Sequence, residues 1–250
     1  LLDGATVVIP GKVAGTNFSD SLLVGHSTTG TLNNAQNNVG VGIGTLDSIT
    51  SGDNNVAIGK NALTALTTSS NNVAVGLSSA QNLTTSAGGN TAFGNSSLYH
   101  NKTGTDNVAI GNSALQGASN QSSSGGVALG ASALEAVTTG ANNIGIGKSA
   151  GDNITSGAGN VIIGSLDAGS ATGSRQLKIA GNDGSTTTTW ISGDSNGQVK
   201  LISGYIAEVA LTDASTITWN AATQPVAKVT LAASRTMGLP ANPVSGQFIS

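Results

Sequence analysis

The sequence NNVAIG, at Asn54–Gly59, is one of nine variants of a hexapeptide that recur along this chain. Each copy ends in glycine, and successive glycines lie 17, 17, 17, 18, 17, 19, 17 and 17 residues apart. These glycines are Gly25, Gly42, Gly59, Gly76, Gly94, Gly111, Gly130, Gly147 and Gly164. A motif that returns at a nearly fixed period indicates a stack of equivalent structural units.

Large and small side chains alternate inside each copy. In Asn54–Gly59 the small Ala57 stands between the β-branched residues Val56 and Ile58, and this period of two is typical of a strand. A leucine follows four residues after most glycines, as Leu63 does, and a polar turn such as Thr50–Asp53 leads into the next copy. Seventeen residues provide for two strands of about five residues and two turns. The sequence therefore predicts an all-β parallel β-solenoid, whose nine coils would form a rod about 40 Å long.

The asparagine before the strand is expected to form a ladder. Asn55 and its equivalents would superpose at one corner of the stack, where each amide can bond the amide one coil away. The expected ladder residues are Asn38, Asn55, Asn72, Asn90, Asn107, Asn143 and Asn160. The alternative is a row of ligand-binding amides, but every coil needs this corner, which favours the structural interpretation.

The small residues of the strand also suggest an assembly. If Ala57 and its equivalents form the outer face of the strand, another backbone must approach them closely, because a solvated face would be polar. A thin coil cannot cover both faces of its strand by itself. A partner chain would provide the second wall, and three-fold symmetry suits a fibre. We therefore expect a homotrimer.

Two longer copies carry a family resemblance. NNVAIGKNAL (Asn54–Leu63) and DNVAIGNSAL (Asp106–Leu115) resemble the head repeats of trimeric autotransporter adhesins, and equally repeats in bacteriophage tail fibres. The resemblance covers residues 20–168. It implies a trimeric, left-handed parallel β-roll, although the coil is somewhat longer here than in adhesin heads.

The hexapeptide repeat ends at Gly164, and the sequence pattern changes after it. RQLKIAG (Arg175–Gly181) predicts a capping strand, and Thr186–Leu201 resembles a connector of phage fibre proteins. ASRTMGLP (Ala233–Pro240) resembles a turn-plus-strand segment of small β modules in phage fibres. No heptads of a coiled-coil stalk follow. These features favour the phage interpretation over the adhesin one.

Four segments are expected along the chain. Residues 1–19 are a lead-in segment, 20–170 the β-solenoid repeat domain and 171–204 a capping and connecting segment. Residues 205–250 are the start of a C-terminal β module that is expected to be incomplete, since the pattern stops at Ser250.

Composition excludes several functional classes. The net charge is −3, and the nine Lys and Arg form no basic stripe, so nucleic-acid binding is not expected. The chain has no cysteine, which removes thiolate metal sites and cysteine nucleophiles. No apolar run reaches the about 20 residues that span a bilayer. Aromatic residues are only 3% of the chain, so a thick globular core is not expected either.

No catalytic, cofactor or metal site is predicted. The histidines and glutamates show no ligand spacing, and the aspartates stand at turns; these residues are His26, His100, Glu135, Glu208, Asp53, Asp106 and Asp152. The acidic loops Gly181–Gly184 and Gly193–Gly197 have too few ligands for a dedicated calcium loop, so they are interpreted as turns. One cluster, Tyr99–Lys102, could stack on a sugar, although a surface loop is the simpler interpretation.

The sequence thus predicts a non-enzymatic fibre. We expect a virion component, a trimeric rod of a phage tail fibre that binds other tail proteins and spaces or presents recognition of a host-surface glycan or protein. The first alternative is the head of a trimeric adhesin on a bacterial surface. A tailspike that depolymerises glycans is the second, but it would need paired carboxylates that the sequence does not provide.

Overall fold

The structure is a computed structural model that describes residues 11–25, 28–118 and 121–201, with residues 209–210, 216–217, 227–228, 232 and 236–237. The chain divides into two units, Leu1–Ile202 and Ser203–Ser250. All regular elements among the described residues are strands. They are β1 (Gly11–Gly15), β2 (Phe18–Val24), β3 (Ala35–Gln36), β4 (Val39–Val41), β5 (Val56–Ile58), β6 (Val73–Val75), β7 (Thr91–Phe93), β8 (Val108–Ile110), β9 (Val127–Leu129), β10 (Ile144–Ile146), β11 (Val161–Ile163), β12 (Leu177–Asn182), β13 (Thr187–Gly193), β14 (Val199–Leu201), β15 (Val209–Ala210), β16 (Thr216–Ile217), β17 (Ala227–Lys228) and β18 (Thr236–Met237).

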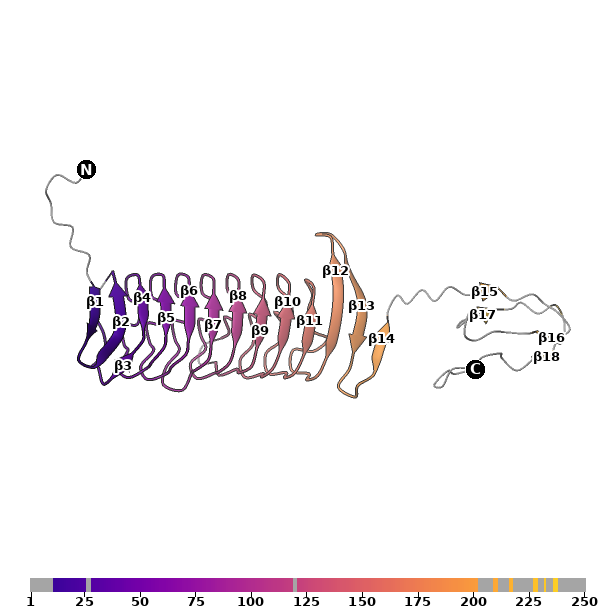
Figure 1. Ribbon diagram of the computed structural model, residues 1–250. Coiled ribbons are helices and arrows are strands. Elements are labelled where there is room, and N and C mark those ends of the chain that lie inside the picture. The colour runs from indigo at the N-terminus through magenta and orange to yellow at the C-terminus, as the bar shows by residue number, and fades with distance from the viewer. Residues whose placement is uncertain are drawn as a thin grey trace, which may run out of the picture. The chain divides into compact units, whose positions relative to one another are not determined.

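The predicted parallel solenoid is confirmed. The strands β2 and β4 to β12 pair in parallel in sequence order, with equivalent residues of successive copies opposite each other, as Val56 is opposite Val73. The chain therefore completes one coil of about 17 residues between neighbouring strands, and Figure 1 shows the coils stacked side by side. The solenoid has about nine turns.

The strands β4 to β11 have three residues each, one strand to a coil, so the expectation of two five-residue strands was wrong. After the strand the backbone enters the left-handed region repeatedly: in the coil of β5, Asn61 has a φ of 61° and Leu63 a φ of 51°. A strand needs negative φ at every residue, so the chain cannot stay extended where residues of positive φ recur. The rest of each coil is held instead by hydrogen bonds from coil to coil, such as Asn61 N–H to the oxygen of Ile43 at 2.8 Å.

A column of glycines turns every coil at the end of its strand. These nine glycines, which we call the corner glycines, are those at the end of each hexapeptide and have φ values from 107° to 139°. A Cβ on Gly59 would lie 2.5 Å from the carbonyl oxygen of Gly76, and a Cβ on Gly111 would lie 2.5 Å from that of Gly130. Both the conformation and the contact exclude a side chain, which explains why glycine returns in each copy.

The small residues of the strands face the interior, which corrects the predicted orientation. Ala57, Ala74 and Ala109 are fully buried within the single chain. The reason is space: a Cβ on Gly145 would lie 2.7 Å from Cγ of Leu134, so the leucine already fills the centre of the coil. The thin coil accommodates small residues inside and leaves the large ones of the strand outside.

Two further columns complete the core. The leucines that follow four residues after most corner glycines are buried, and these are Leu46, Leu63, Leu98, Leu115 and Leu134. A third column, not identified from the sequence, is buried beside them and consists of Ile49, Leu66, Leu83, Val137 and Ile154. The core is therefore narrow and aliphatic, and it extends along the stack as one cluster.

The asparagine ladder is confirmed. Asn72 is buried, and its Oδ1 accepts hydrogen bonds from the backbone N–H and the Nδ2 of Asn90, both at 3.1 Å. Its Nδ2 donates to Oδ1 of Asn55 at 3.1 Å. The ladder is interrupted at Gly126, and Gln176 extends it beyond Asn160. These amides satisfy one another and the backbone at the corner, which supports the structural interpretation over a ligand row.

Antiparallel strands bound the solenoid at both ends. β1 pairs with β2 at the start, and β12, β13 and β14 follow one another antiparallel at the end. The strand expected at Arg175–Gly181 is β12, which is parallel to β11. In the second unit β15 pairs with β17 and β16 pairs with β18. These four short strands lie in the segment 205–250, where the sequence predicts a β module, and most other residues of that segment lie outside the described part.

Candidate interaction surface

The outer face of the sheet is a continuous apolar stripe. The first and third residues of each three-residue strand point outward, since alternate residues of a strand share a face. We call this surface the outer stripe. One column comprises Leu22, Val39, Val56, Val73, Thr91, Val108, Val127, Ile144, Val161 and Leu177. The other comprises Val24, Val41, Ile58, Val75, Phe93, Ile110, Leu129, Ile146, Ile163 and Ile179.

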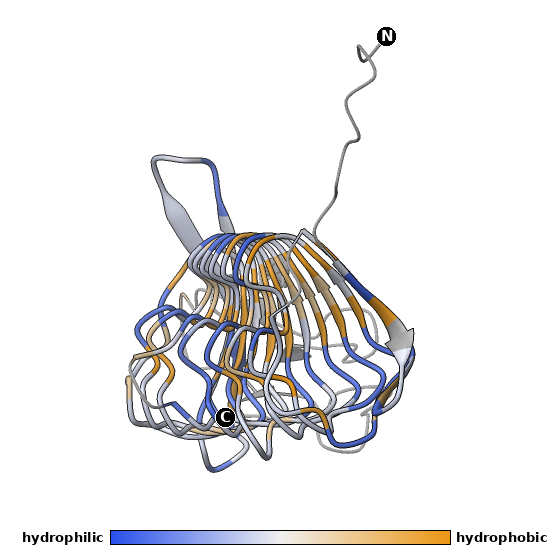
Figure 2. Ribbon diagram, turned by 90° about the vertical axis from the view of Figure 1, so that its left-hand side faces the viewer, coloured by the Kyte–Doolittle hydropathy of each residue, from blue (hydrophilic) through white to orange (hydrophobic). Residues whose placement is uncertain are grey.

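The residues of the outer stripe are exposed or half-buried in the single chain, and none of them is charged. Ile58 is 40% exposed and Ile110 is 44% exposed. Ten strands at about 4.8 Å spacing give the stripe a length of about 45 Å. In Figure 2 the strands of the sheet form an orange band, whereas the loops of the coils are largely blue or pale, with scattered orange residues. Single exposed apolar residues are ordinary on protein surfaces, but a contiguous stripe of this length is typical of an interaction site.

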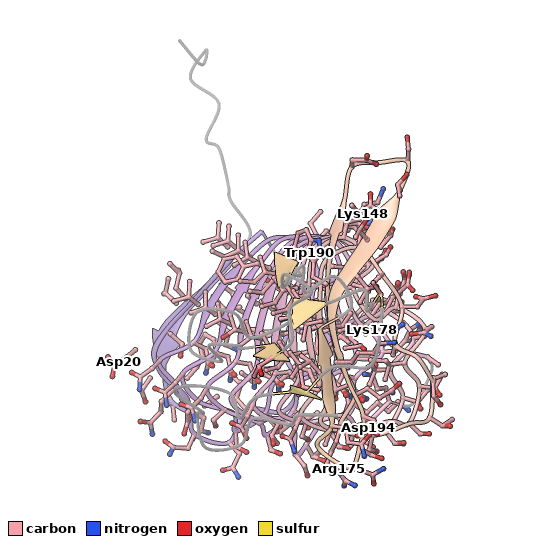
Figure 3. The ribbon with its side chains drawn as sticks, turned by 90° about the vertical axis from the view of Figure 1, so that its right-hand side faces the viewer. Asp20, Lys148, Arg175, Lys178, Trp190 and Asp194 are labelled. Atoms are coloured by element: carbon pink, nitrogen blue, oxygen red, sulfur yellow. The ribbon has the colours of Figure 1, made fainter. Side chains whose placement is uncertain are left out.

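A hairpin extends beyond the coils at the C-terminal end of the sheet. β12 and β13 contain six and seven residues, compared with three in the coil strands. In Figure 3 the hairpin projects past the outline of the coils, with Trp190 near its base. The Trp190 side chain is 51% exposed. The indole lies over Gly181, because a Cβ there would be 2.6 Å from Cζ2.

One pair of carboxyl groups lies near the same end. A hydrogen bond between the side chains of Asp152 and Asp167 raises the pKa of Asp167, and partial burial and the charge of Asp152 raise it further. The positive charge of Lys178 opposes this shift. Lys178 also donates through Nζ to the backbone oxygen of Asp167 at 2.9 Å. The pair and the lysine together form a small polar end to the last coil.

The cluster Tyr99–Lys102 does not form a single surface. Asn101 is fully buried at the level where other coils have Leu66 or Leu83. Its Nδ2 donates to the oxygen of Ser123 at 2.9 Å. The rings of Tyr99 and His100 are half-buried and pack edge to face, with centroids 4.5 Å apart. The aromatic pair therefore packs on itself, and the asparagine belongs to the interior.

The two acidic loops form turns, as interpreted from the sequence. Oδ1 of Asp183 accepts from the backbone N–H of Thr186 at 2.7 Å and of Ser185 at 2.9 Å, and these bonds lower the pKa of Asp183. Oδ1 of Asp194 accepts from two backbone N–H groups in the same way. The described residues contain no group of three or more potential metal ligands. His26 and Glu208 lie outside the described residues.

The described part of the chain has no helical segment with the length and apolarity needed to cross a bilayer. A comparison with protein-family models, with curated proteins and with solved structures finds no match to this chain. The outer stripe and the hairpin were not singled out from the sequence as sites. A signal for the hairpin was present, since RQLKIA (Arg175–Ala180) matches the hexapeptide but ends in alanine, and the residue 17 positions after Gly164 is Gly181.

Proposed function

We propose that this chain is a structural, non-enzymatic segment of a phage tail fibre that associates as a homotrimer through the outer stripe. The solenoid is a stiff stack in which each coil bonds the next, and such a stack suits a spacer. The observation that carries the proposal is the outer stripe, an uncharged and partly exposed apolar surface that continues from coil to coil. Its removal from water provides a driving force of about 25 cal/mol per Å² of apolar area.

The outer stripe replaces the small-residue face as the site of trimer contact. Val and Ile of each coil would meet the same residues of two other copies around a three-fold axis, as closed symmetry requires. The stripe carries no Lys, Arg, Asp or Glu, so like charges would not oppose the approach of identical chains. The polar surfaces of the three coils would then face solvent.

In this role the rod would space or present host recognition on a virion. The repeats resemble phage fibres and adhesin heads equally, but Thr186–Leu201 and Ala233–Pro240 resemble segments of phage fibres, and this resemblance supports the virion over a bacterial surface. The proposed partners are two further copies, other tail proteins and a glycan or protein of the host surface. Weak contacts on a trimeric rod would gain strength from multivalency.

Sedimentation of the full chain with matched variants tests the assembly. The unmodified protein is expected to sediment as a trimer, and Ile58→Glu with Ile110→Glu is expected to give folded monomers. The control is Leu77→Glu, because Leu77 is 47% exposed but follows the corner glycine Gly76, away from the stripe. A monomeric unmodified protein, or equal effects of both changes, would contradict the proposal.

Labelling with an antibody distinguishes the phage fibre from the alternative, the head of a trimeric bacterial adhesin. Binding along fibres of purified virions is expected. Labelling of intact, uninfected bacteria instead would favour the adhesin. Release of sugars from a host glycan by the purified protein would contradict the non-enzymatic role.

A further inference from the structure

One position breaks the column of corner glycines. β12 stacks on β11 with Ile179 opposite Ile163. The next residue, Ala180, therefore occupies the position that Gly164 has in the preceding coil, and Ala180 lies within the extended strand β12. Because alanine does not make the corner turn, the strand runs straight on. The sheet consequently continues past the edge of the coil on which it is built.

The continuation is a two-stranded segment, residues 180–189, which with Trp190 we call the overhang. Its register pairs Ala180 with Thr189 and Asn182 with Thr187. Residues 182–188 are all exposed, because no coil lies beneath this part of the hairpin. A segment with both faces in solvent gains little from its own chain beyond the hairpin hydrogen bonds.

Trp190 is the large apolar residue of the overhang. Ile179 is opposite Ile191 and Ala180 is opposite Thr189, so Trp190 is the extra residue of a bulge. Its indole covers Gly181, which shares a face with Ile179 because the two are separated by one residue. Ile179 belongs to the outer stripe. Trp190 thus extends the outer stripe beyond the last coil.

Identical coils leave the register between chains undefined. The outer stripe repeats Val, Ile and Leu at each level, and only Thr91 and Phe93 depart from the pattern. A copy that slipped by one coil, about 4.8 Å, would bury nearly the same apolar groups. A feature that occurs once per chain is needed to make one register the most stable, as in other repetitive interfaces.

We propose that the overhang docks on a second copy of this chain, with Trp190 as its anchor, and thereby fixes the register of the assembly. This inference rests on the trimer proposed above. Trp190 and the stripe form one apolar surface, so a chain that covers the stripe near β12 also covers the indole. Tryptophan anchors of this kind dominate the binding energy of many interfaces.

A sugar is the competing occupant of this surface. The polar groups around the indole come from Asn182, Asp183, Thr186 and Thr188. Asn182 already donates to the Thr187 hydroxyl and accepts from Gly184 N–H, and Asp183 accepts two backbone N–H groups. The amide of Asn182 and the carboxylate of Asp183 are thus engaged in holding the hairpin, whereas a sugar site needs such groups directed to the ligand. The apolar occupant is therefore favoured.

Tryptophan fluorescence of the full chain tests the docking. Trp219 is the only other tryptophan, so Trp219→Phe makes Trp190 the single reporter. Acrylamide quenching of Trp190 is expected to be several-fold weaker in this protein than in its monomeric form with Ile58→Glu and Ile110→Glu. Equal quenching in a protein that sediments as a trimer would overturn the docking and leave the trimer intact. A monomeric parent protein would refute both.

A cysteine cross-link tests the register. The chain has no cysteine, so Ile110→Cys can cross-link only to the same residue of a copy at the same level. The cross-linked dimer is expected in high yield, and adding Trp190→Ser should reduce the yield several-fold while Tyr99→Ser should not. An unchanged yield with Trp190→Ser would overturn the register role. Protection of Trp190 that appears only on addition of host oligosaccharide would overturn self-docking in favour of a sugar site.

Discussion

Replacement of Gly111 by alanine should destabilise the stack, as it should at the other corner glycines. Gly111 has a φ of 136°, and an added Cβ would lie 2.5 Å from the carbonyl carbon and oxygen of Gly130. The disfavoured conformation costs about 1–3 kcal/mol, and forcing the coils apart costs about 1–3 kcal/mol more. We expect Gly111→Ala to lower the free energy of unfolding by about 2–6 kcal/mol in total.

Gly159→Ala is the matched control. Gly159 also has a positive φ, 67°, but an added Cβ there meets only Cγ of Arg175 at 3.7 Å. Other coils have asparagine or aspartate at this position, as at Asn142, so a side chain is accepted in the left-handed conformation. Gly159→Ala should lower the free energy of unfolding by about 1–2 kcal/mol, because it incurs only the cost of the left-handed backbone conformation.

Chemical denaturation followed by circular dichroism measures both variants. Repeat stacks can lose coils locally, so hydrogen exchange should accompany it. In Gly111→Ala the amides of β8 and β9 should exchange faster, whereas those of β4 and β5 should change little. If the two variants have equal midpoints and equal exchange, the stacked corner glycines do not limit the approach of the coils, and the reasoning fails.

Three further outcomes are expected. Asn72→Ala should destabilise the protein by about 2–5 kcal/mol in denaturation, since two buried donors of the next ladder residue lose their acceptor, whereas the exposed Asn95→Ala should change stability by less than about 0.5 kcal/mol. Ala109→Glu should abolish the β signal in circular dichroism, because an unpaired charge inside the coil costs several kcal/mol; a folded monomer would show that this face is not interior. Because the pKa of Asp167 is raised above 3.8 in the folded state, its contribution to stability is present below that pH and declines as the pH rises through the folded pKa; Asp152→Asn should flatten this decline in the unfolding midpoint, and an unchanged pH profile would contradict the pairing.

The period, the corner and the ladder could be predicted from the sequence because stacking repeats each chemical requirement once per coil. Gly59 and Gly76 occupy one corner, and a side chain at either would meet the backbone of its neighbour. Asn55 and Asn72 must satisfy each other, so both are asparagine. A constraint of this kind makes the same residue type recur once per coil. Nine copies make the 17-residue spacing evident even though no family model matches the chain.

The orientation of the strand was decided by the tertiary structure. Alternation of Val56, Ala57 and Ile58 defines two faces, but a period of two carries no information about which face is inside. The leucine at position 63 settles this, because its side chain fills the coil and leaves room only for a methyl group opposite. That arrangement depends on the left-handed backbone conformation at Leu63. Leucine rarely adopts this conformation, so it could not be predicted from the sequence.

The candidate surfaces were also determined partly by the sequence and partly by the tertiary structure. The sequence contains each residue of the outer stripe, yet exposure depends on how much space the coil leaves inside. The overhang depends on a single missing glycine: Ala180 ends the column of corner turns and lets β12 continue. Local sequence thus determined where the chain can turn, whereas the packing of one coil on the next determined which side of the strand meets water, because burial is a property of the whole cross-section.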